Sequence, residues 1–148
     1  MRAYPTMGRT SPARVLKLAQ SFLLFRKTSM DRAEFNTICN GLTATTHVVQ
    51  WGDSDVWKVG GKVFAICGFN HGLDAFVFKA SDITFNVLKD QPGIRPAPYM
   101  ASRGLKWLQH YGAPGLSDEE LHHHILQSYR MVASGLSAKK RRELQIDQ

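Results

Sequence analysis

Two adjacent glycines, Gly60 and Gly61, constrain the fold of this chain more than any other feature. They separate two apolar runs rich in β-branched and aromatic residues, Trp57–Val59 and Lys62–Ile66. Two residues that adopt positive φ readily, placed between two such runs, are a strong signal for a β-hairpin. After a second turn comes another apolar run, Leu73–Lys79. The stretch therefore predicts a three-stranded antiparallel meander on which the other elements pack.

The two-residue loop also predicts how the strands pair. Val59 is expected opposite Lys62, and Trp57 opposite Phe64. Because side chains alternate along a strand, the hairpin should have two distinct faces. One face would carry Trp57, Val59, Phe64 and Ile66, and the other Lys58, Val63, Ala65 and Cys67. Lys58 and Lys62 should therefore point to opposite faces. The third strand has apolar residues at both parities, so both of its faces are expected to be covered.

Helix-start signals frame the meander on both sides. Asp31 and Glu34 resemble a capping box that opens a first helix. Ser117 and Glu120 form a full capping box at the start of the longest helix, which should extend to about Gly135. Further expected elements are a strand at 47–51, a short helix at 82–90 with Ile83, Val87 and Leu88 inward, an extended segment at 94–100, a closing strand at 105–111 and a last helix capped by Ser137. The expected fold is α+β, an antiparallel sheet of about five strands with flanking N- and C-terminal helices.

The positive charge of the chain is unevenly distributed. The net charge is +7, yet residues 1–29 contain six Lys and Arg and no acid. Residues 30–148 hold the other 13 basic residues against all 12 acidic ones, so this part is nearly neutral. The high isoelectric point alone therefore says little about partners, and a binding site must be argued from a local patch.

Residues 1–29 differ in composition from the rest and are expected to form a basic, poorly ordered leader ahead of a single domain, 30–148. The apolar part at 13–25 is too short to span a bilayer and precedes no cleavage site. Three interpretations remain open: a basic amphipathic surface helix, an organelle presequence, or an extension upstream of a start at Met30. The 148 residues suit one domain with an ordinary core.

Nothing in the sequence points to catalysis or to a metal. His122, His123 and His124 are consecutive on a predicted helix and so point about 100° apart, which favours a solvated helix face over a metal site. No pair of carboxylates has a spacing suited to acid–base catalysis, and Ser128 lacks a nucleophile elbow. We therefore expect a protein that is not an enzyme and needs no metal or cofactor. Cys39, far from the second cysteine at position 67, indicates buried thiols in a reducing, cytoplasmic setting.

Basic and aromatic residues are interleaved between Val56 and Leu116. On β-ribbons, this combination can track the phosphates of nucleic acid. The candidate nucleic-acid-binding residues are Lys58, Lys62, Lys79, Arg95, Arg103 and Lys106, with Trp57, Tyr99 and Trp107 as aromatic support. For any single one of these cations, the alternative is an ordinary solubilising role.

Several runs of the sequence resemble the MmcQ/YjbR family in order and spacing: WKVGGKVFAIC, FKAS, IRPAPYM, LKW and QSYRMVASGLSAKKRREL. The resemblance extends from Met30 to about Leu144. It implies a frataxin-like (CyaY-like) fold and DNA binding through two wing-like hairpins. The first wing would be the Gly60-Gly61 hairpin with Lys58 and Lys62, and the second the region from Arg95 to Trp107. Frataxin-like iron handling is not expected, because the first helix offers only Asp31 and Glu34 as acids.

Together these observations predict a small, non-enzymatic, cytoplasmic protein that binds DNA with low sequence specificity. The alternative is a protein- or small-ligand-binding module that uses the aromatic face of the sheet.

Overall fold

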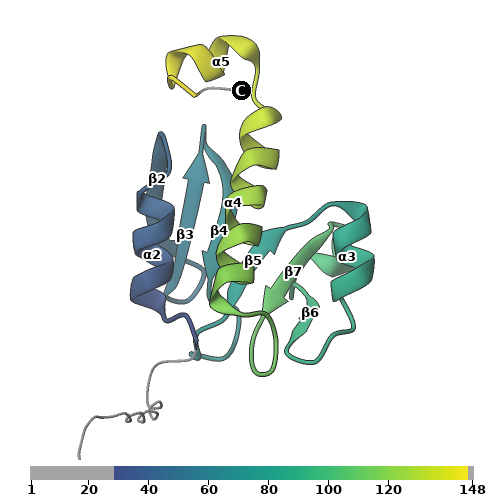
Figure 1. Cartoon of the computed structure of the whole chain (residues 1–148). Coiled ribbons are helices and arrows are strands. Elements are labelled where there is room, and N and C mark those ends of the chain that lie inside the picture. Colours follow the sequence, from purple (N-terminus) through teal and green to yellow (C-terminus); the bar gives the residue numbers. More distant parts are fainter. Residues whose placement is uncertain (1–28, 147–148) are drawn as a thin grey trace, which may run out of the picture.

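The computed structural model describes residues 29–146, so nearly all of the expected leader, 1–29, lies outside the described residues. The fold is α+β, as predicted, and is built on a six-stranded antiparallel sheet in the order β2-β3-β4-β5-β7-β6 (Figure 1). The strands are β2 (Thr45–Gln50), β3 (Ser54–Val59), β4 (Lys62–Cys67), β5 (Phe76–Lys79), β6 (Ile94–Pro96) and β7 (Trp107–His110). The sixth strand is β6, which lies in the segment expected only to be extended and which pairs with β7 at the edge of the sheet.

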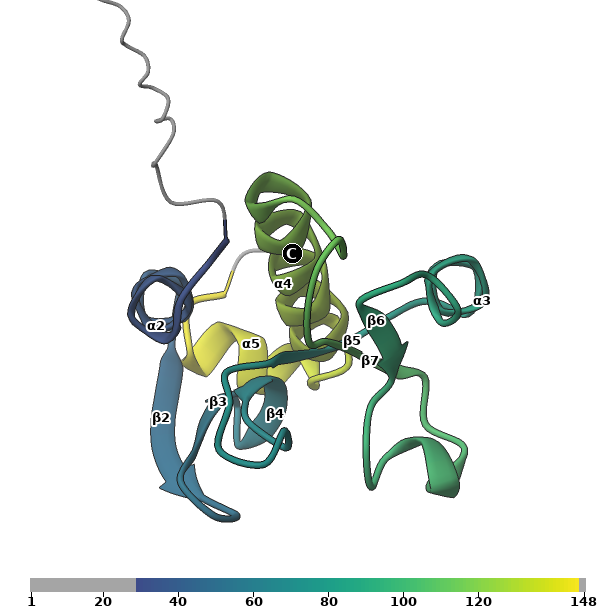
Figure 2. The ribbon, with the colours of Figure 1, turned by 90° about the horizontal axis from the view of Figure 1, so that it is seen from below.

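The helices divide the sheet into a covered and an open face. Within residues 29–146 they are α2 (Arg32–Asn40), α3 (Asp82–Leu88), α4 (Asp118–Ser134) and α5 (Ala138–Glu143), with a 3-10 turn, η1 (Ala101–Arg103). Figure 2 shows α2, α4 and α5 on one side of the sheet, which we call the helix-covered face. The other side, the open face, carries only the segment around η1, and α3 lies beyond the β6–β7 edge.

Side chains from both faces form the core. On the helix-covered face, the stripe of α4 predicted from the sequence is buried against the sheet, and it includes Leu121, Ile125 and Val132. A smaller apolar cluster lies on the open face: Val56, Ile66, Val77, Ala97 and Trp107. Both faces of β5 are covered, as predicted, because Phe76 and Phe78 belong to the larger cluster and Val77 to the smaller.

The pairing of β3 with β4 departs from the prediction after its first step. Val59 lies opposite Lys62 as expected, but Trp57 lies opposite Ala65 rather than Phe64, because a bulge interrupts the ladder. One extra residue reverses the alternation of the strand that contains it. Ala65 and Cys67 therefore join the helix-covered face with Phe64, and Ile66 turns to the open face.

The predicted inward face of α3 is wrong at two of its three positions. Ile83 is 78% and Val87 60% exposed, whereas Leu88 packs against the core as predicted, together with Phe85. This short helix contacts only the edge of the sheet, and one turn of side chains suffices to cover that edge. By contrast, the capping boxes at Asp31 and Ser117 and the caps at Ser81 and Ser137 form as predicted.

Candidate ligand and nucleic-acid interface on the open face

A row of basic and apolar side chains, the first row, crosses the open face near the Gly60-Gly61 turn. It consists of two cross-strand pairs: Lys58 pairs with Val63, and Lys79 pairs with Trp107. Val63, Lys79 and Trp107 also line one shallow cavity of about 290 Å³, where β4 and β5 separate, and its lining is completed from the other side by Lys62, Met131, Val132 and Gly135. In this gap Ser128 of α4 donates to Phe64 O (2.6 Å) and accepts from Lys79 N (2.8 Å). The backbone that carries Lys79 is thus held in place by a buried hydroxyl.

A second row, further from that turn, is apolar at its centre and basic at one end. Its members pair across five strand interfaces in the order Val48, Val56, Ile66, Val77, Gln109 and Arg95. The strand positions of the open face therefore include the cations Lys58, Lys79 and Arg95, and in residues 29–146 they include no carboxylate.

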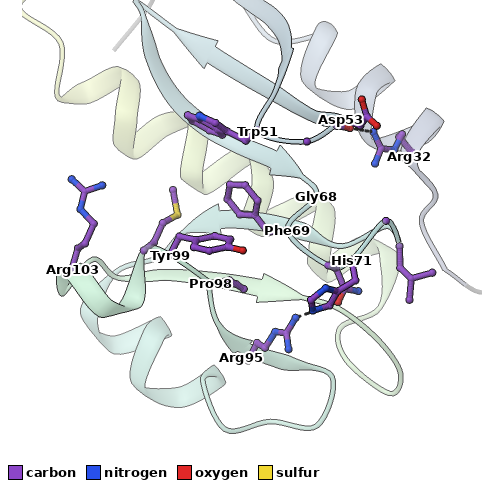
Figure 3. A pocket seen from close by; sticks show the side chains of 15 residues that line it. Arg32, Trp51, Asp53, Gly68, Phe69, His71, Arg95, Pro98, Tyr99 and Arg103 are labelled. Carbon is purple, nitrogen blue, oxygen red and sulfur yellow. Dashed lines mark hydrogen bonds between the residues drawn. The ribbon is translucent and has the colours of Figure 1, made fainter.

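Beyond the second row lies a pocket of about 930 Å³, open to one side (Figure 3). Three connections between strands form its walls: residues 51–53 after β2, 68–73 after β4, and 98–103 after β6. Arg32 of α2 and Arg95 of β6 complete the lining. The pocket therefore depends on segments that are distant in sequence and that the sheet brings together.

Three aromatic rings follow one another along this pocket. The ring centroids of Trp51 and Phe69 are 5.9 Å apart, and those of Phe69 and Tyr99 are 5.3 Å apart in an edge-to-face contact. Trp51 is 53% and Tyr99 74% exposed. Figure 3 shows Phe69 between the other two rings, so both outer rings keep accessible surface.

The guanidinium group of Arg95 is held in a fixed orientation. Its Nε donates to Gln109 Oε1 (2.7 Å), its Nη2 donates to Asn70 Oδ1 (3.3 Å), and it lies 4.5 Å from the centre of the Tyr111 ring. Gln109 is fully buried and is itself fixed, because its Nε2 donates to two backbone carbonyls. None of these partners is a carboxylate, so the positive charge of Arg95 remains uncompensated.

Arg103 and Arg32 occupy opposite ends of the pocket and differ in charge pairing (Figure 3). Arg103 is exposed, and its side chain makes no hydrogen bond within the described residues. Arg32 is paired twice, with Asp55 at 2.7 Å and Asp74 at 3.2 Å, so its charge is largely neutralised. The pocket therefore offers two available guanidinium groups, those of Arg95 and Arg103.

The backbone around the pocket concentrates uncommon conformations. Seven non-glycine residues between 29 and 146 have positive φ, and five of them line this pocket: Trp51, Asp53, Phe69, His71 and Tyr99. Residues other than glycine adopt this region rarely, and such conformations tend to cluster at functional sites. This clustering favours the pocket of about 930 Å³ over the shallow cavity of about 290 Å³ as the candidate functional site.

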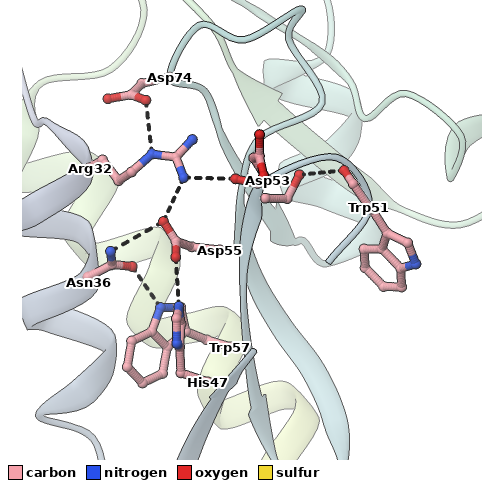
Figure 4. A network of polar contacts seen from close by, with 9 residues as sticks. Arg32, Asn36, His47, Trp51, Asp53, Asp55, Trp57 and Asp74 are labelled. Carbon is pink, nitrogen blue, oxygen red and sulfur yellow. Dashed lines mark hydrogen bonds and ion pairs between the residues drawn. The ribbon is translucent and has the colours of Figure 1, made fainter. Parts of the chain in front are cut away.

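A polar network around Asp55 anchors one wall of the pocket (Figure 4). The carboxylate accepts from Arg32 Nη1 (2.7 Å) and Asn36 Nδ2 (3.3 Å), and His47 Nε2 lies 2.7 Å away. Arg32 Nη1 also donates to Asp53 O (3.0 Å). Burial alone would raise the pKa of Asp55, but its hydrogen bonds and the charge of Arg32 outweigh burial, and the pKa is lowered.

The nine candidate residues fall into five places rather than one patch. Lys58, Lys79 and Trp107 share the first row of the open face, and Arg95, Tyr99 and Arg103 line the pocket. Lys62 points to the opposite face from Lys58, as predicted. Lys106 lies over the Phe85 ring at 5.2 Å, beside α3. Trp57 is 5% exposed and donates to Asn36 Oδ1 (2.9 Å), so it is a core residue.

Trp51 and Phe69 are aromatic residues of the pocket that were not predicted from the sequence. Both are large aromatic side chains in turns next to glycine, at Trp51-Gly52 and Gly68-Phe69. An aromatic side chain in a turn has no strand face to bury it, and this signal could have pointed to exposed rings.

Within residues 29–146, the structure bears on the histidine run, on metal binding and on membrane-spanning helices. His124 is not simply solvated, as its ring stacks on Phe78 at 5.5 Å between centroids. In this part of the chain, no group of three or more His, Cys, Asp or Glu residues could hold a metal ion. Among the described helices, none combines the length and the apolar character needed to cross a membrane.

The fold and the pocket define an α+β protein with an open antiparallel sheet, helices on one face and an arginine- and aromatic-lined pocket on the other. The YjbR family model matches residues 40–131, and the chain belongs to this family. No curated protein sequence matches the chain.

Among the solved structures that resemble the fold are the following two. One is a Deinococcus radiodurans protein with a DUF419 domain, at a TM-score of 0.67 and 18% identity, covering 78% of this chain and 88% of the other. The second is a Pseudomonas syringae protein, at a TM-score of 0.55 and 22% identity, covering 70% of this chain and 99% of the other. At these identities the likeness concerns the fold alone.

Proposed function

We propose that this protein binds DNA with low sequence specificity across the open face of its sheet, in the cytoplasm and without catalysing a reaction. The charge of that face carries the proposal: Lys58, Lys79 and Arg95 occupy strand positions that include no carboxylate in residues 29–146. Contacts from Lys and Arg to phosphates supply affinity and carry no sequence information. A face of this kind suits binding that is insensitive to sequence.

The nearly neutral total charge of residues 30–148 is compatible with this proposal, because the acids lie away from the strand positions of the open face. Asp55 lies on the helix-covered side, paired with Arg32, and three acids stand in the first turn of α4, where the helix dipole favours them. The cations of the open face extend from β3 to β6, roughly 20 Å at the usual spacing of strands. This span is long enough to reach several phosphates of a duplex.

The cysteines support a non-enzymatic role in a reducing compartment. Cys39 and Cys67 are both buried and free. Burial raises the pKa of both thiols, that of Cys67 to about 11, so neither is a ready nucleophile at neutral pH.

Equilibrium binding to duplex DNA over a range of salt concentrations tests the proposal. Two duplexes of unrelated sequence should bind the full chain with similar affinity, and log K should fall steeply as log salt rises. An affinity that is absent at low salt, or that does not change with salt, would contradict DNA binding.

A second candidate function, small-ligand binding, is favoured by a different observation. The pocket of about 930 Å³ has exposed rings and is of a size typical for small-molecule sites. Binding there would depend on Trp51 and Tyr99 rather than on the lysines of the first row. The two functions therefore respond to different substitutions.

A further inference from the structure

We infer that the pocket is a site for one nucleotide unit, a flat base with its phosphate. The base would stack against the exposed rings, and the phosphate would bind the guanidinium group of Arg103, while the charge of Arg95, on the other side of Tyr99, would add to the positive potential of the pocket (Figure 3). The unit could be an unpaired nucleotide of a single strand or a free mononucleotide, since the recognising chemistry is the same. If the nucleotide belongs to a single strand, the inference deepens the proposed DNA binding and rests on it. If it is a free mononucleotide, the inference is independent of DNA binding.

The rings provide the first half of the recognition. Tyr99 is 74% exposed on one side of Phe69, and Trp51 is 53% exposed on the other. Exposed aromatic rings are costly in water, and stacking by a base would cover them while tolerating any base identity. Positive φ at Trp51, Phe69 and Tyr99 holds these side chains in turns instead of burying them in the sheet.

The arginines provide the second half. Arg95 uses its Nε and Nη2 on neutral partners, which fixes its plane and leaves its charge for an anion. Arg103 has no side-chain hydrogen bond in residues 29–146. A planar guanidinium binds phosphate oxygens with favourable geometry, and such charge-assisted hydrogen bonds are about twice as strong as neutral ones. A ligand with both a ring and a phosphate matches this pair of features better than a ligand with only one.

The position of the pocket selects unpaired nucleotides over a duplex. Bases within a duplex are stacked on one another, so their flat surfaces are not available to Trp51 or Tyr99. The pocket adjoins the end of the second row, since Arg95 belongs to both. A single strand that follows the cations of the open face could therefore place one base in the pocket.

Calorimetric titration of the full chain with adenosine monophosphate, adenosine and inorganic phosphate tests the inference. The monophosphate should bind more tightly than either fragment. Tyr99→Asn removes the ring but keeps a residue that tolerates positive φ, and Arg103→Gln removes one charge. Each should weaken binding of the monophosphate by about tenfold, the order expected for one stacked base or one charged hydrogen bond. The matched controls Val87→Asn and Arg142→Gln, at exposed sites outside the pocket, should leave it unchanged.

Single strands identify the source of the nucleotide. A deoxythymidine oligomer that binds more tightly than an abasic oligomer of equal length assigns the pocket to single strands. Equal binding of the two oligomers, with binding of the monophosphate retained, assigns it to a free nucleotide. Monophosphate binding no tighter than that of phosphate, or unaffected by both pocket variants, would overturn the inference. If the nucleotide inference fails but duplex binding that depends on Lys58 and Lys79 persists, the proposed DNA binding stands alone. If duplex binding is also absent, both the inference and the proposed function fail.

Discussion

At the scale of single residues, Asp55 links the stability of the protein to the shape of its pocket. Its side chain is 9% exposed and binds groups from α2 and from β2. Arg32, held by this carboxylate, also binds Asp53 O and Asp74, which belong to two of the connections beside the pocket. Asp55 thus fixes the helix and two turns relative to the sheet.

Replacing Asp55 with Asn should lower the free energy of unfolding by about 1–3 kcal/mol, the usual cost of disrupting a buried hydrogen-bonded group. The lower part of this range is the better expectation, because the Arg32 side chain is 35% exposed and water can partly replace the lost partner. Urea unfolding measures the change. The control is Asp53→Asn, the same chemical change at an exposed position two residues away. Equal effects of the two substitutions would contradict the role given to Asp55.

One buried and one partly buried histidine, His110 and His124, predict a stability that depends on pH. Burial lowers the pKa of His110 and of His124 in the folded state. The unfolded chain then binds protons more readily than the folded one, so stability is greatest above the ordinary histidine pKa and declines as pH falls through it. Urea unfolding should show a lower free energy at about pH 5 than at about pH 7. The difference should shrink in His124→Gln but not in His122→Gln, an exposed control on the same helix. A difference that His124→Gln leaves unchanged would remove His124 from this account.

At the scale of elements, the turn between β3 and β4 has two glycines for two different reasons. Both have positive φ, +59° at Gly60 and +81° at Gly61. A Cβ at Gly60 would lie 2.6 Å from Leu136 Cδ1, whereas a Cβ at Gly61 would have no atom within 4 Å. Gly60 is thus limited by packing as well as by backbone conformation, and Gly61 by conformation alone.

Replacing Gly61 with Val should cost on the order of 1–3 kcal/mol of unfolding free energy, because a β-branched residue is strongly disfavoured at positive φ. Gly61→Asn should cost clearly less, since Asn tolerates this region. Both can be compared by urea unfolding. If Val costs no more than Asn, the strain would not come from the backbone.

The elements that sequence reading predicted well are those set by neighbouring residues. The glycine turn, the capping boxes and the stripe of α4 depend on a few positions close together in the chain. The bulge opposite Trp57 does not, because Phe64 is held by contacts from α4: its ring meets Tyr129 at 5.3 Å and its carbonyl accepts from Ser128. A helix more than sixty residues away thus sets the register.

The same limit applies to the candidate site. Arg95, Tyr99 and Arg103 were predicted because basic and aromatic residues alternate in their segment. Trp51 and Phe69 were not, because the pocket forms only when three connections meet at one end of the sheet. Lys62 and Lys106 were predicted from their places in the two proposed wings, but the alternation of the strand directs Lys62 to the opposite face from Lys58, and Lys106 lies over the Phe85 ring.

At the scale of the whole molecule, the two faces of the sheet have different roles. The helix-covered face contains the larger core and the part-buried ion pair of Arg32 and Asp55, which stabilise the fold. The open face combines cations with exposed rings. In the proposed function, the local charge of the open face, and not the total charge of the chain, determines binding.

The salt dependence of duplex binding in two charge-matched double variants tests this claim most directly. Residues 1–29 carry six cations that would add to the slope of log K against log salt. The binding face is therefore identified by comparing the two variants, both of which keep these six cations. Lys58→Gln with Lys79→Gln removes two cations from the open face, and Lys139→Gln with Lys140→Gln removes two exposed cations from α5. The account predicts that the first pair reduces the slope of log K against log salt by about 2, close to one unit per lost phosphate contact. In the first double variant, the affinity should fall equally for DNA duplexes of unrelated sequence. The second double variant should change neither the affinity nor the slope appreciably. Equal slopes in the two folded variants would contradict the account.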